Sequence, residues 1–211
     1  MFELDVLLSR DGRVVVIHDD TLDRTTDGEG KVAAFTLAEL KKLDAGSWFS
    51  AEFAGERIPT LEEALRLAKG RILVNVEIKT EAVGHGVVAK TLEVIDELDM
   101  KDNVVISSFD PKALSKAREL DPHIRTASLF NAELQKGMSP EAVMAEVGSN
   151  GFNLSRRQVD AGIVAACHRL ARPVSVYTVN EINEMERLIR LGVNAIFTDR
   201  PDRLLRVLAA P

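Results

Sequence analysis

The chain has 211 residues, of which 45% are hydrophobic and 28% are charged, and its formal net charge at pH 7 is −6. This composition predicts one globular domain with a sizeable core. The acidic balance argues against a broad nucleic-acid-binding surface and against electrostatic docking on anionic lipid. The lone cysteine, Cys167, excludes an internal disulfide and fits a reducing compartment. No segment reads as a membrane span or a signal peptide, so we expect a cytoplasmic protein.

The first predicted element is a hairpin with arms at 2–6 and 14–18. Glu3 and Asp5 lie two residues apart, so both side chains point to the same face of a strand. Two carboxylates on one face are costly unless a cation or protons lie between them. Pairing of the arms would bring His18 level with residues 4–5. Oxygen ligands beside an acid–base imidazole suit phosphoester chemistry, and an edge hairpin with scattered charges is the alternative.

Residues 19–59 form a long polar and glycine-rich excursion. Thr36 and Glu39 have the spacing of a capping box, which predicts a short helix from residue 37. Trp48 and Phe49 could cover a pocket or could attach the excursion to the body. Long loops on compact domains tend to be functional. We therefore expect a single domain of residues 1–211 with a cap-like insertion at 19–59.

From residue 60 onward, helices and apolar strands alternate with short connections, which is typical of parallel strands buried on both faces. No Gly-x-Gly-x-x-Gly segment follows a strand, which disfavours a dinucleotide-binding sheet. Polar residues at the carboxyl ends of many strands favour a barrel with one mouth. The sequence predicts an α/β fold of the TIM-type (β/α)8 barrel, incomplete with about seven barrel strands. We expect helices at 60–69, 84–98, 111–120, 139–147, 160–171, 180–191 and 201–208, and strands at 72–79, 104–109, 126–130, 151–154, 174–179 and 195–199.

The barrel is one strand–helix unit short by this reading, and we expect the gap to lie before residue 1. Open strand edges on both sides of such a gap invite pairing with another chain. The sequence therefore predicts a homo-oligomer or a poorly stable monomer.

Glu77 lies on the strand next to the hairpin and would add a third carboxylate to Glu3 and Asp5. Three carboxylates with room for water suit Mg²⁺ or Ca²⁺ better than zinc. Lys79 shares the face of Glu77, where it could neutralise a phosphate oxygen or form a salt bridge with Glu77 or Asp5. The remaining histidines, His85, His123 and His168, are expected to be structural or on the surface.

Eight segments match one known family in order, at 3–6, 18–26, 43–47, 58–63, 76–79, 107–110, 176–180 and 196–201. Over nearly its whole length the chain resembles the glycerophosphodiester phosphodiesterases. The resemblance implies a divalent cation held by Glu3, Asp5 and Glu77, with His18 as one of two catalytic histidines. It also implies that Lys79 contacts the phosphate and that Tyr177 walls the glycerol pocket. The implied reaction is metal-dependent hydrolysis of a glycerophosphodiester to glycerol 3-phosphate and an alcohol.

The sequence departs from the family pattern at its start. The His-Arg-Gly strand and the Glu-Asn-Thr helix of the family are absent, and with them the second acid–base histidine and a phosphate-binding arginine. Losing a positioned acid–base group costs roughly 10²–10⁴ in rate. Two alternatives therefore stay open, a non-catalytic relative that binds phosphate or metal, and a phospholipase D-like lipid hydrolase with Trp48 and Phe49 as its membrane-facing residues.

Overall fold

The computed structural model describes residues 1–79, 86–131, 138–139, 142–143, 145 and 148–209. The chain forms two compact units, one of Met1–Ser108 and Ser115–Arg125, the other of Phe109–Leu114 and Thr126–Pro211. Within the described residues, no helix combines the length and the apolar character needed to cross a membrane.

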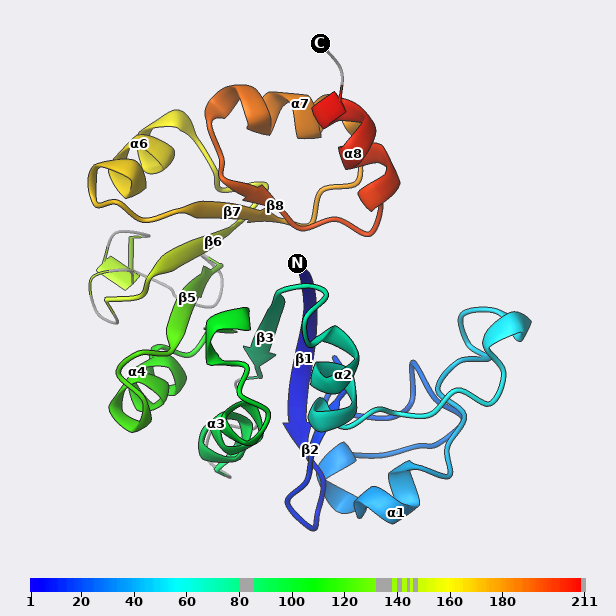
Figure 1. Ribbon diagram of the computed structural model, residues 1–211. Coiled ribbons are helices and arrows are strands. Elements are labelled where there is room, and N and C mark those ends of the chain that lie inside the picture. Colours follow the sequence, from blue (N-terminus) through cyan, green and yellow to red (C-terminus); the bar gives the residue numbers. More distant parts are fainter. Residues whose placement is uncertain (80–85, 132–137, 140–141, 144, 146–147, 210–211) are drawn as a thin grey trace. The chain divides into compact units, whose positions relative to one another are not determined.

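The first unit carries four strands in the order β2-β1-β3-β4 (Figure 1). They are β1 (Phe2–Leu8), β2 (Val14–Val16), β3 (Val74–Ile78) and β4 (Val104–Ser108). The pair β1–β2 is antiparallel, and Gly12 supports its turn with a φ of 73°. The pairs β1–β3 and β3–β4 are parallel, with Asp5 opposite Glu77 in the first. This register places the polar residues of neighbouring strands next to one another.

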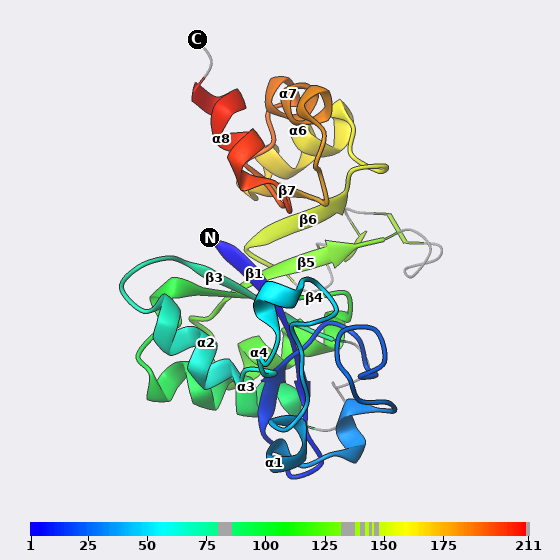
Figure 2. The same ribbon diagram turned by 90° about the vertical axis from the view of Figure 1, so that its right-hand side faces the viewer.

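Two helices cover the hairpin side of this unit, α2 (Leu61–Ala68) and α3 (Val87–Glu97) (Figure 2). Helix α2 contacts α3 and β2, and α3 also contacts β1. Thr60 begins α2 through a complete capping box with Glu63. A 3₁₀ helix, η4 (Lys101–Asn103), precedes β4, and α4 (Pro111–Leu120) follows it. The apolar faces of these elements supply fully buried side chains, among them Val6, Val15, Leu65, Val76, Ile95 and Ile106.

The insertion, residues 19–59, contains three short helices: η1 (Val32–Ala34), α1 (Leu37–Leu40) and η2 (Ala51–Phe53). Among its side chains, Leu22, Leu40 and Ile58 are buried. The predicted capping box of α1 is present at Thr36. The chain leaves the insertion next to the strand from which it entered, because the N–H of Val16 donates to the carbonyl of Pro59 at 2.8 Å. The insertion is thereby attached to the hairpin at both ends.

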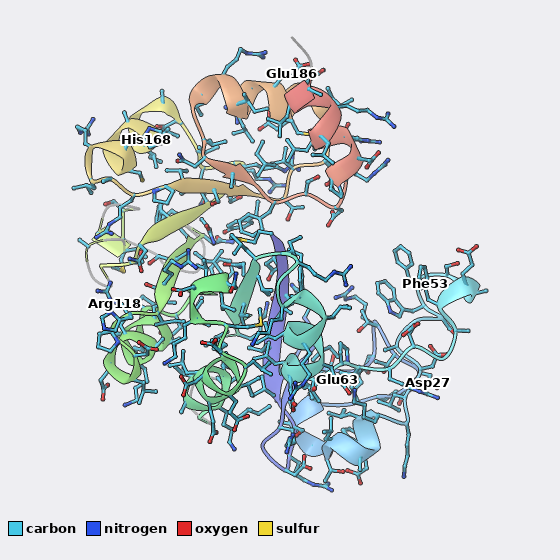
Figure 3. The ribbon with its side chains drawn as sticks, in the orientation of Figure 1. Asp27, Phe53, Glu63, Arg118, His168 and Glu186 are labelled. Carbon is cyan, nitrogen blue, oxygen red and sulfur yellow. The ribbon has the colours of Figure 1, made fainter. Side chains whose placement is uncertain are left out.

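The loop after α1 presents aromatic side chains to solvent. Trp48 is 51% exposed and Phe49 is 70% exposed. Phe49 contacts both Trp48 and Phe53 edge to face, with ring centroids 5.7 and 5.6 Å apart. Figure 3 shows Phe53 at the far end of this loop, away from the strands of the first unit.

The strands of the second unit have the order β5-β6-β7-β8, and three of its described helices follow β6, β7 and β8. The strands are β5 (Arg125–Phe130), β6 (Gly151–Ser155), β7 (Val174–Tyr177) and β8 (Ala195–Ile196), all joined by parallel pairing. The helices are α6 (Ala161–Arg169), α7 (Ile182–Leu191) and α8 (Pro201–Ala209). Phe152, Val164, Val176 and Leu188 belong to its buried core.

The predicted fold class is confirmed: helices and parallel strands alternate as in a (β/α)8-type fold. In the part of the chain that the structure describes, seven strands are of the predicted barrel type, β1 and β3 to β8, with β2 as the hairpin arm. The strand predicted over 195–199 is shorter, because beyond Phe197 the Thr198 hydroxyl and the Asp199 N–H donate to the side chain of Asn180. The start of the helix predicted at 84–98, with His85, and parts of the helix predicted at 139–147 lie outside the described residues. The single-domain prediction stays a prediction.

Candidate metal and phosphate site

Three carboxylates meet at the β1–β3 pair. Glu3 and Asp5 come from β1, Glu77 comes from β3, and one carboxylate oxygen of each lies within 4.8 Å of the others. The alternation of a strand places Glu3 and Asp5 on one face, and the parallel register adds Glu77 directly opposite Asp5. Among the described residues this is the one group of three or more acidic, histidine or cysteine side chains able to share an ion.

The electrostatics of the cluster favour a positive partner. The side chains of Asp5 and Glu77 are each only 12% exposed, whereas Glu3 is the more open of the three. Burial of its carboxyl group, together with the negative charges of Asp5 and Glu77, raises the pKa of Glu3 to about 8. Burial also raises the pKa of Glu77, although Lys79 opposes this shift. Protons or a bound cation would reduce the repulsion among the negative charges of these carboxylates.

The donor atoms of this cluster fit a hard divalent cation. All three groups offer oxygen, and neither histidine nitrogen nor cysteine sulfur belongs to the group. Oxygen-only ligation suits Mg²⁺ or Ca²⁺, while zinc favours nitrogen and sulfur. The structure thus contains a possible acidic metal site, as the spacing of these residues predicts.

Lys79 lies at the end of β3 with its ammonium between two of the carboxylates. Its Nζ is 3.3 Å from Asp5 Oδ1 and 3.2 Å from Glu77 Oε1, and its side chain is 17% exposed. Burial disfavours the charged form, but Glu77 and Asp5 outweigh it and raise the pKa of Lys79. Lys79 is therefore a resident cation in this cluster. The salt bridge considered from the sequence is present, and the contact with phosphate stays a prediction.

His18 follows β2 and is held by its neighbour in the sequence. Its Nδ1 lies 2.6 Å from Asp19 Oδ1. Arg24 binds both oxygens of Asp19, with Nε 2.6 Å from Oδ2 and Nη2 2.9 Å from Oδ1. The Arg24 hydrogen bond, and then that of His18, hold the pKa of Asp19 well below its usual range. Because an ionised Asp19 can only accept, Nδ1 donates, which leaves Nε2 as the free ring position.

The position of His18 links it to the carboxylates. The backbone N–H of Ile17 donates to the carbonyl of Asp5 at 3.1 Å. The charge of His18 also acts on Glu77, whose pKa it lowers slightly against the larger effect of burial. The His18 side chain itself is 63% exposed, so a ligand can reach it. His18 thus lies next to the acidic cluster without being part of it.

Sequence reasoning missed Asp19 and Arg24 as parts of this arrangement. The signal was present, since both lie in the matched segment 18–26, and an acidic residue directly after a candidate acid–base histidine is a natural orienting group. The surface or structural role expected for the other described histidines stays a prediction. The backbone N–H of His123 donates to the side chain of Asp121, and the Nε2 of His168 lies 3.0 Å from Asn194 Oδ1.

Tyr177 ends β7 in the second unit. Its hydroxyl donates to the carbonyl of Phe130 at 2.7 Å, and its ring meets Phe109 edge to face with centroids 6.1 Å apart. These contacts fix the ring at the carboxyl end of its strand. Its predicted role as a wall of the glycerol pocket stays a prediction.

Comparison with protein families gives a match along almost the whole chain. A model described as the glycerophosphoryl diester phosphodiesterase family matches residues 1–203. A glycerophosphodiester phosphodiesterase of Caldanaerobacter subterraneus subsp. tengcongensis is 39% identical over 208 residues, covering 98% of this chain and 84% of the relative. A glycerophosphodiester phosphodiesterase of Bacillus altitudinis is 35% identical over 210 residues, covering 97% of this chain and 84% of the relative.

Solved structures agree with this match. A phosphodiesterase of Oleispira antarctica, in complex with the product sn-glycerol-3-phosphate, is similar with a TM-score of 0.91 and 32% identity, over 99% of this chain and 84% of that chain. A glycerophosphodiester phosphodiesterase of Agrobacterium tumefaciens is similar with a TM-score of 0.83 and 30% identity, over 97% of this chain and 86% of that chain.

Proposed function

Since the chain belongs to the glycerophosphoryl diester phosphodiesterase family, we propose that it hydrolyses glycerophosphodiesters to glycerol 3-phosphate and an alcohol. The observation that carries this proposal is the meeting of Glu3, Asp5 and Glu77, with the residue before His18 hydrogen-bonded to the backbone of Asp5. Such an arrangement offers a cation site for phosphate oxygens and an imidazole for proton transfer. The similar phosphodiesterase of Oleispira antarctica is in complex with the product sn-glycerol-3-phosphate, which supports the same substrate class.

Glu3, Asp5 and Glu77 would hold a divalent cation, either Mg²⁺ or Ca²⁺. When bound, the cation would stabilise negative charge on the phosphate oxygens and ease deprotonation of a water molecule. Lys79 carries a second positive charge at the same place, and its ammonium would donate to a phosphate oxygen. The predicted role of Tyr177 as a wall of the glycerol pocket belongs to this proposal as well.

In the overall reaction, a water oxygen bonds to phosphorus and the bond from phosphorus to the alcohol oxygen breaks. One proton of that water ends on the released alcohol. His18 is suited to move this proton, because Asp19 engages Nδ1 at 2.6 Å and leaves Nε2 to face the substrate. Asp19 orients the ring and stabilises its charged form, and Arg24 orients Asp19 in turn.

Release of glycerol 3-phosphate from glycerophosphoglycerol tests the proposal, with Mg²⁺, with Ca²⁺ and with chelator. We expect activity only with a cation, and a loss of at least about 100-fold in Glu77→Gln, since removing one carboxylate weakens the cation site. Glu119→Gln is the matched control, because Glu119 is an exposed glutamate paired with Lys116 on α4. Cation-independent release, or equal activity in both variants, would contradict the proposal.

A second candidate is a non-catalytic relative that binds phosphate and metal. The Lys79 ammonium, 3.3 Å from Asp5 Oδ1 and 3.2 Å from Glu77 Oε1, would serve a binder of phosphate as well as an enzyme. The two candidates separate in one experiment: a binder shows cation-dependent binding of glycerol 3-phosphate by calorimetry, without release of product from any diester.

Two further proposals concern the surroundings of the protein. We infer a cytoplasmic location from the single cysteine, which fits a reducing compartment. A homo-oligomer that pairs through exposed strand edges also stays a proposal. Sedimentation of the purified chain at several concentrations tests the second proposal, and a monomer at every concentration would contradict it.

A further inference from the structure

A pocket of about 390 Å³ opens beside His18, within the first unit, at the place where the insertion leaves and rejoins the hairpin. The end of β2 with the residues after it and the returning chain just before α2 line it side by side, joined by the bond from the N–H of Val16 to the carbonyl of Pro59. The insertion supplies the rest. Its lining includes Ile17, His18, Arg24, Trp48, Arg57 and Pro59.

The shape of this pocket is held by hydrogen bonds. The Nε1 of Trp48 donates to the carbonyl of Ala45 at 2.9 Å, which orients the indole ring. Arg24 lies over that ring, 5.9 Å from its centroid, and its guanidinium is bound to both oxygens of Asp19. Arg24 therefore already occupies one face of the Trp48 ring as a cation–π partner. A ligand meets a fixed aromatic wall instead of an open cage for an ammonium group.

The charge of the pocket is positive. Arg24 is neutralised by Asp19, but Arg57 donates from Nη1 to a neutral group, the carbonyl of Lys42, at 2.7 Å. Among the residues that the structure describes, no aspartate or glutamate lines this pocket. Asp19 is already engaged by His18 and Arg24, so a cationic ligand would approach the charge of Arg57 without a compensating carboxylate among the described lining residues.

We infer that this pocket binds the alcohol portion of the diester and selects uncharged or anionic alcohols over ammonium-bearing ones. The inference rests on the proposed function and deepens it. If His18 protonates the departing alcohol oxygen, the alcohol must lie within hydrogen-bond reach of His18, and the pocket is the space that His18 lines. Its remaining walls, from Ile17 across Trp48 to Pro59, suit the carbon skeleton of such an alcohol.

The chain has a built-in reporter for this pocket, because Trp48 is its one tryptophan. We would titrate the cation-loaded protein with four diesters that share glycerol phosphate: glycerophosphoglycerol, glycerophosphoinositol, glycerophosphocholine and glycerophosphoethanolamine. The first two should change Trp48 emission at about 5- to 10-fold lower concentration than the last two, which is the size of one like-charge contact near a surface. Glycerol 3-phosphate, which has no alcohol group, should bind with little change in Trp48 emission.

Two variants assign the preference to the pocket. Arg57→Glu should reduce or invert the ratio of the two groups of diesters in binding and in kcat/KM. The matched control is Arg71→Glu, since Arg71 is an exposed arginine that also donates to a backbone carbonyl, that of Leu67, but lies outside the pocket. The control should leave the ratio unchanged.

The outcomes separate this inference from the proposed function. If no diester releases glycerol 3-phosphate while the emission changes follow the expected order, the proposed reaction is wrong and the alcohol pocket stands. If turnover occurs but ammonium-bearing diesters bind as well as the others, or Arg57→Glu leaves the ratio unchanged, the inference is overturned. An equal emission change with glycerol 3-phosphate overturns it as well, because the alcohol group would then not be what Trp48 senses.

Discussion

Replacing Lys79 by methionine should destabilise the cation-free protein far more than the cation-loaded one. The Lys79 ammonium lies 3.3 Å from Asp5 Oδ1 and 3.2 Å from Glu77 Oε1, with all three side chains largely buried. At an effective dielectric constant of about 20, each contact is worth roughly 5 kcal/mol before the desolvation of the ammonium is subtracted. Breaking a buried ion pair from one side typically costs about 3–5 kcal/mol. We expect a loss of about 3 kcal/mol in the free energy of unfolding without cation.

A divalent cation should recover most of this loss. In Lys79→Met, Mg²⁺ or Ca²⁺ supplies the positive charge that the carboxylates of Glu3, Asp5 and Glu77 have lost. The variant should also bind the cation more tightly than the natural chain, because the competing ammonium is gone. The cation stabilises both proteins, so at saturation the deficit shrinks by RT ln of the ratio of their dissociation constants. A site that is about 30-fold tighter in the variant would reduce the deficit from about 3 to about 1 kcal/mol.

Thermal unfolding with chelator and with each cation measures both quantities. For a chain of this size, about 3 kcal/mol corresponds to a decrease of roughly 6–12 °C in Tm. Lys101→Met is the matched control: its ammonium also lies between two carboxylates, 2.7 Å from Asp96 and 3.1 Å from Asp121, but the side chain is 44% exposed. It should give a much smaller shift that the cation does not change. An equal deficit of Lys79→Met with and without cation would refute the reasoning.

Three further changes test other parts of the site. Asp19→Asn removes the charge that orients His18, so kcat should fall by about 10- to 100-fold with KM nearly unchanged; an unchanged kcat would show that the ring needs no orienting group. In chelator, Glu3 keeps its proton in the folded chain between pH 4.5 and about 8, whereas it loses that proton in the unfolded chain. The free energy of unfolding should therefore fall as pH rises through this window. Added cation should remove that slope, as should Glu3→Gln, and a stability that rises over the same window would count against the raised pKa. Asp44→Ala should speed limited proteolysis within residues 44–56, because its carboxylate accepts the N–H groups of Gly46, Ser47 and Gly55 at 2.8–2.9 Å. Proteolysis no faster than that of the natural chain would contradict this.

The carboxylate cluster shows which parts of a site can be predicted from spacing. The period of two in a strand is a local rule, so Glu3 and Asp5 could be assigned to one face without knowing the fold. The position of Glu77 required more, because the register that places it opposite Asp5 depends on how β1 and β3 pair across more than 70 residues of chain. Alternation of strands and helices made the pairing plausible, and the order of the matched segments supported it.

The surroundings of His18 could not be predicted in the same way. Its contact with Asp19 joins adjacent residues, yet adjacency alone does not direct two side chains toward each other. The bidentate contact between Arg24 and Asp19 depends on the path of the loop between these two residues. The pocket beside His18 was also out of reach, since its walls come from three stretches of the insertion and the hairpin that only the folded backbone brings together. Trp48 was recognised as a candidate wall or attachment, and its position at this pocket favours the first of these roles.

The hairpin explains how chemistry and substrate choice can be separated in this chain. Strand β1 supplies Glu3 and Asp5, while the chain that follows β2 supplies His18 and then enters the insertion. The insertion returns beside the same strand through the bond from Val16 to Pro59, so its two ends are fixed next to the carboxylates. The residues in between contribute pocket walls but none of the three acidic groups. Changes inside the insertion can therefore alter which alcohol fits without moving the cation site, which is why Arg57→Glu should change substrate preference while Glu77→Gln should abolish turnover for every diester.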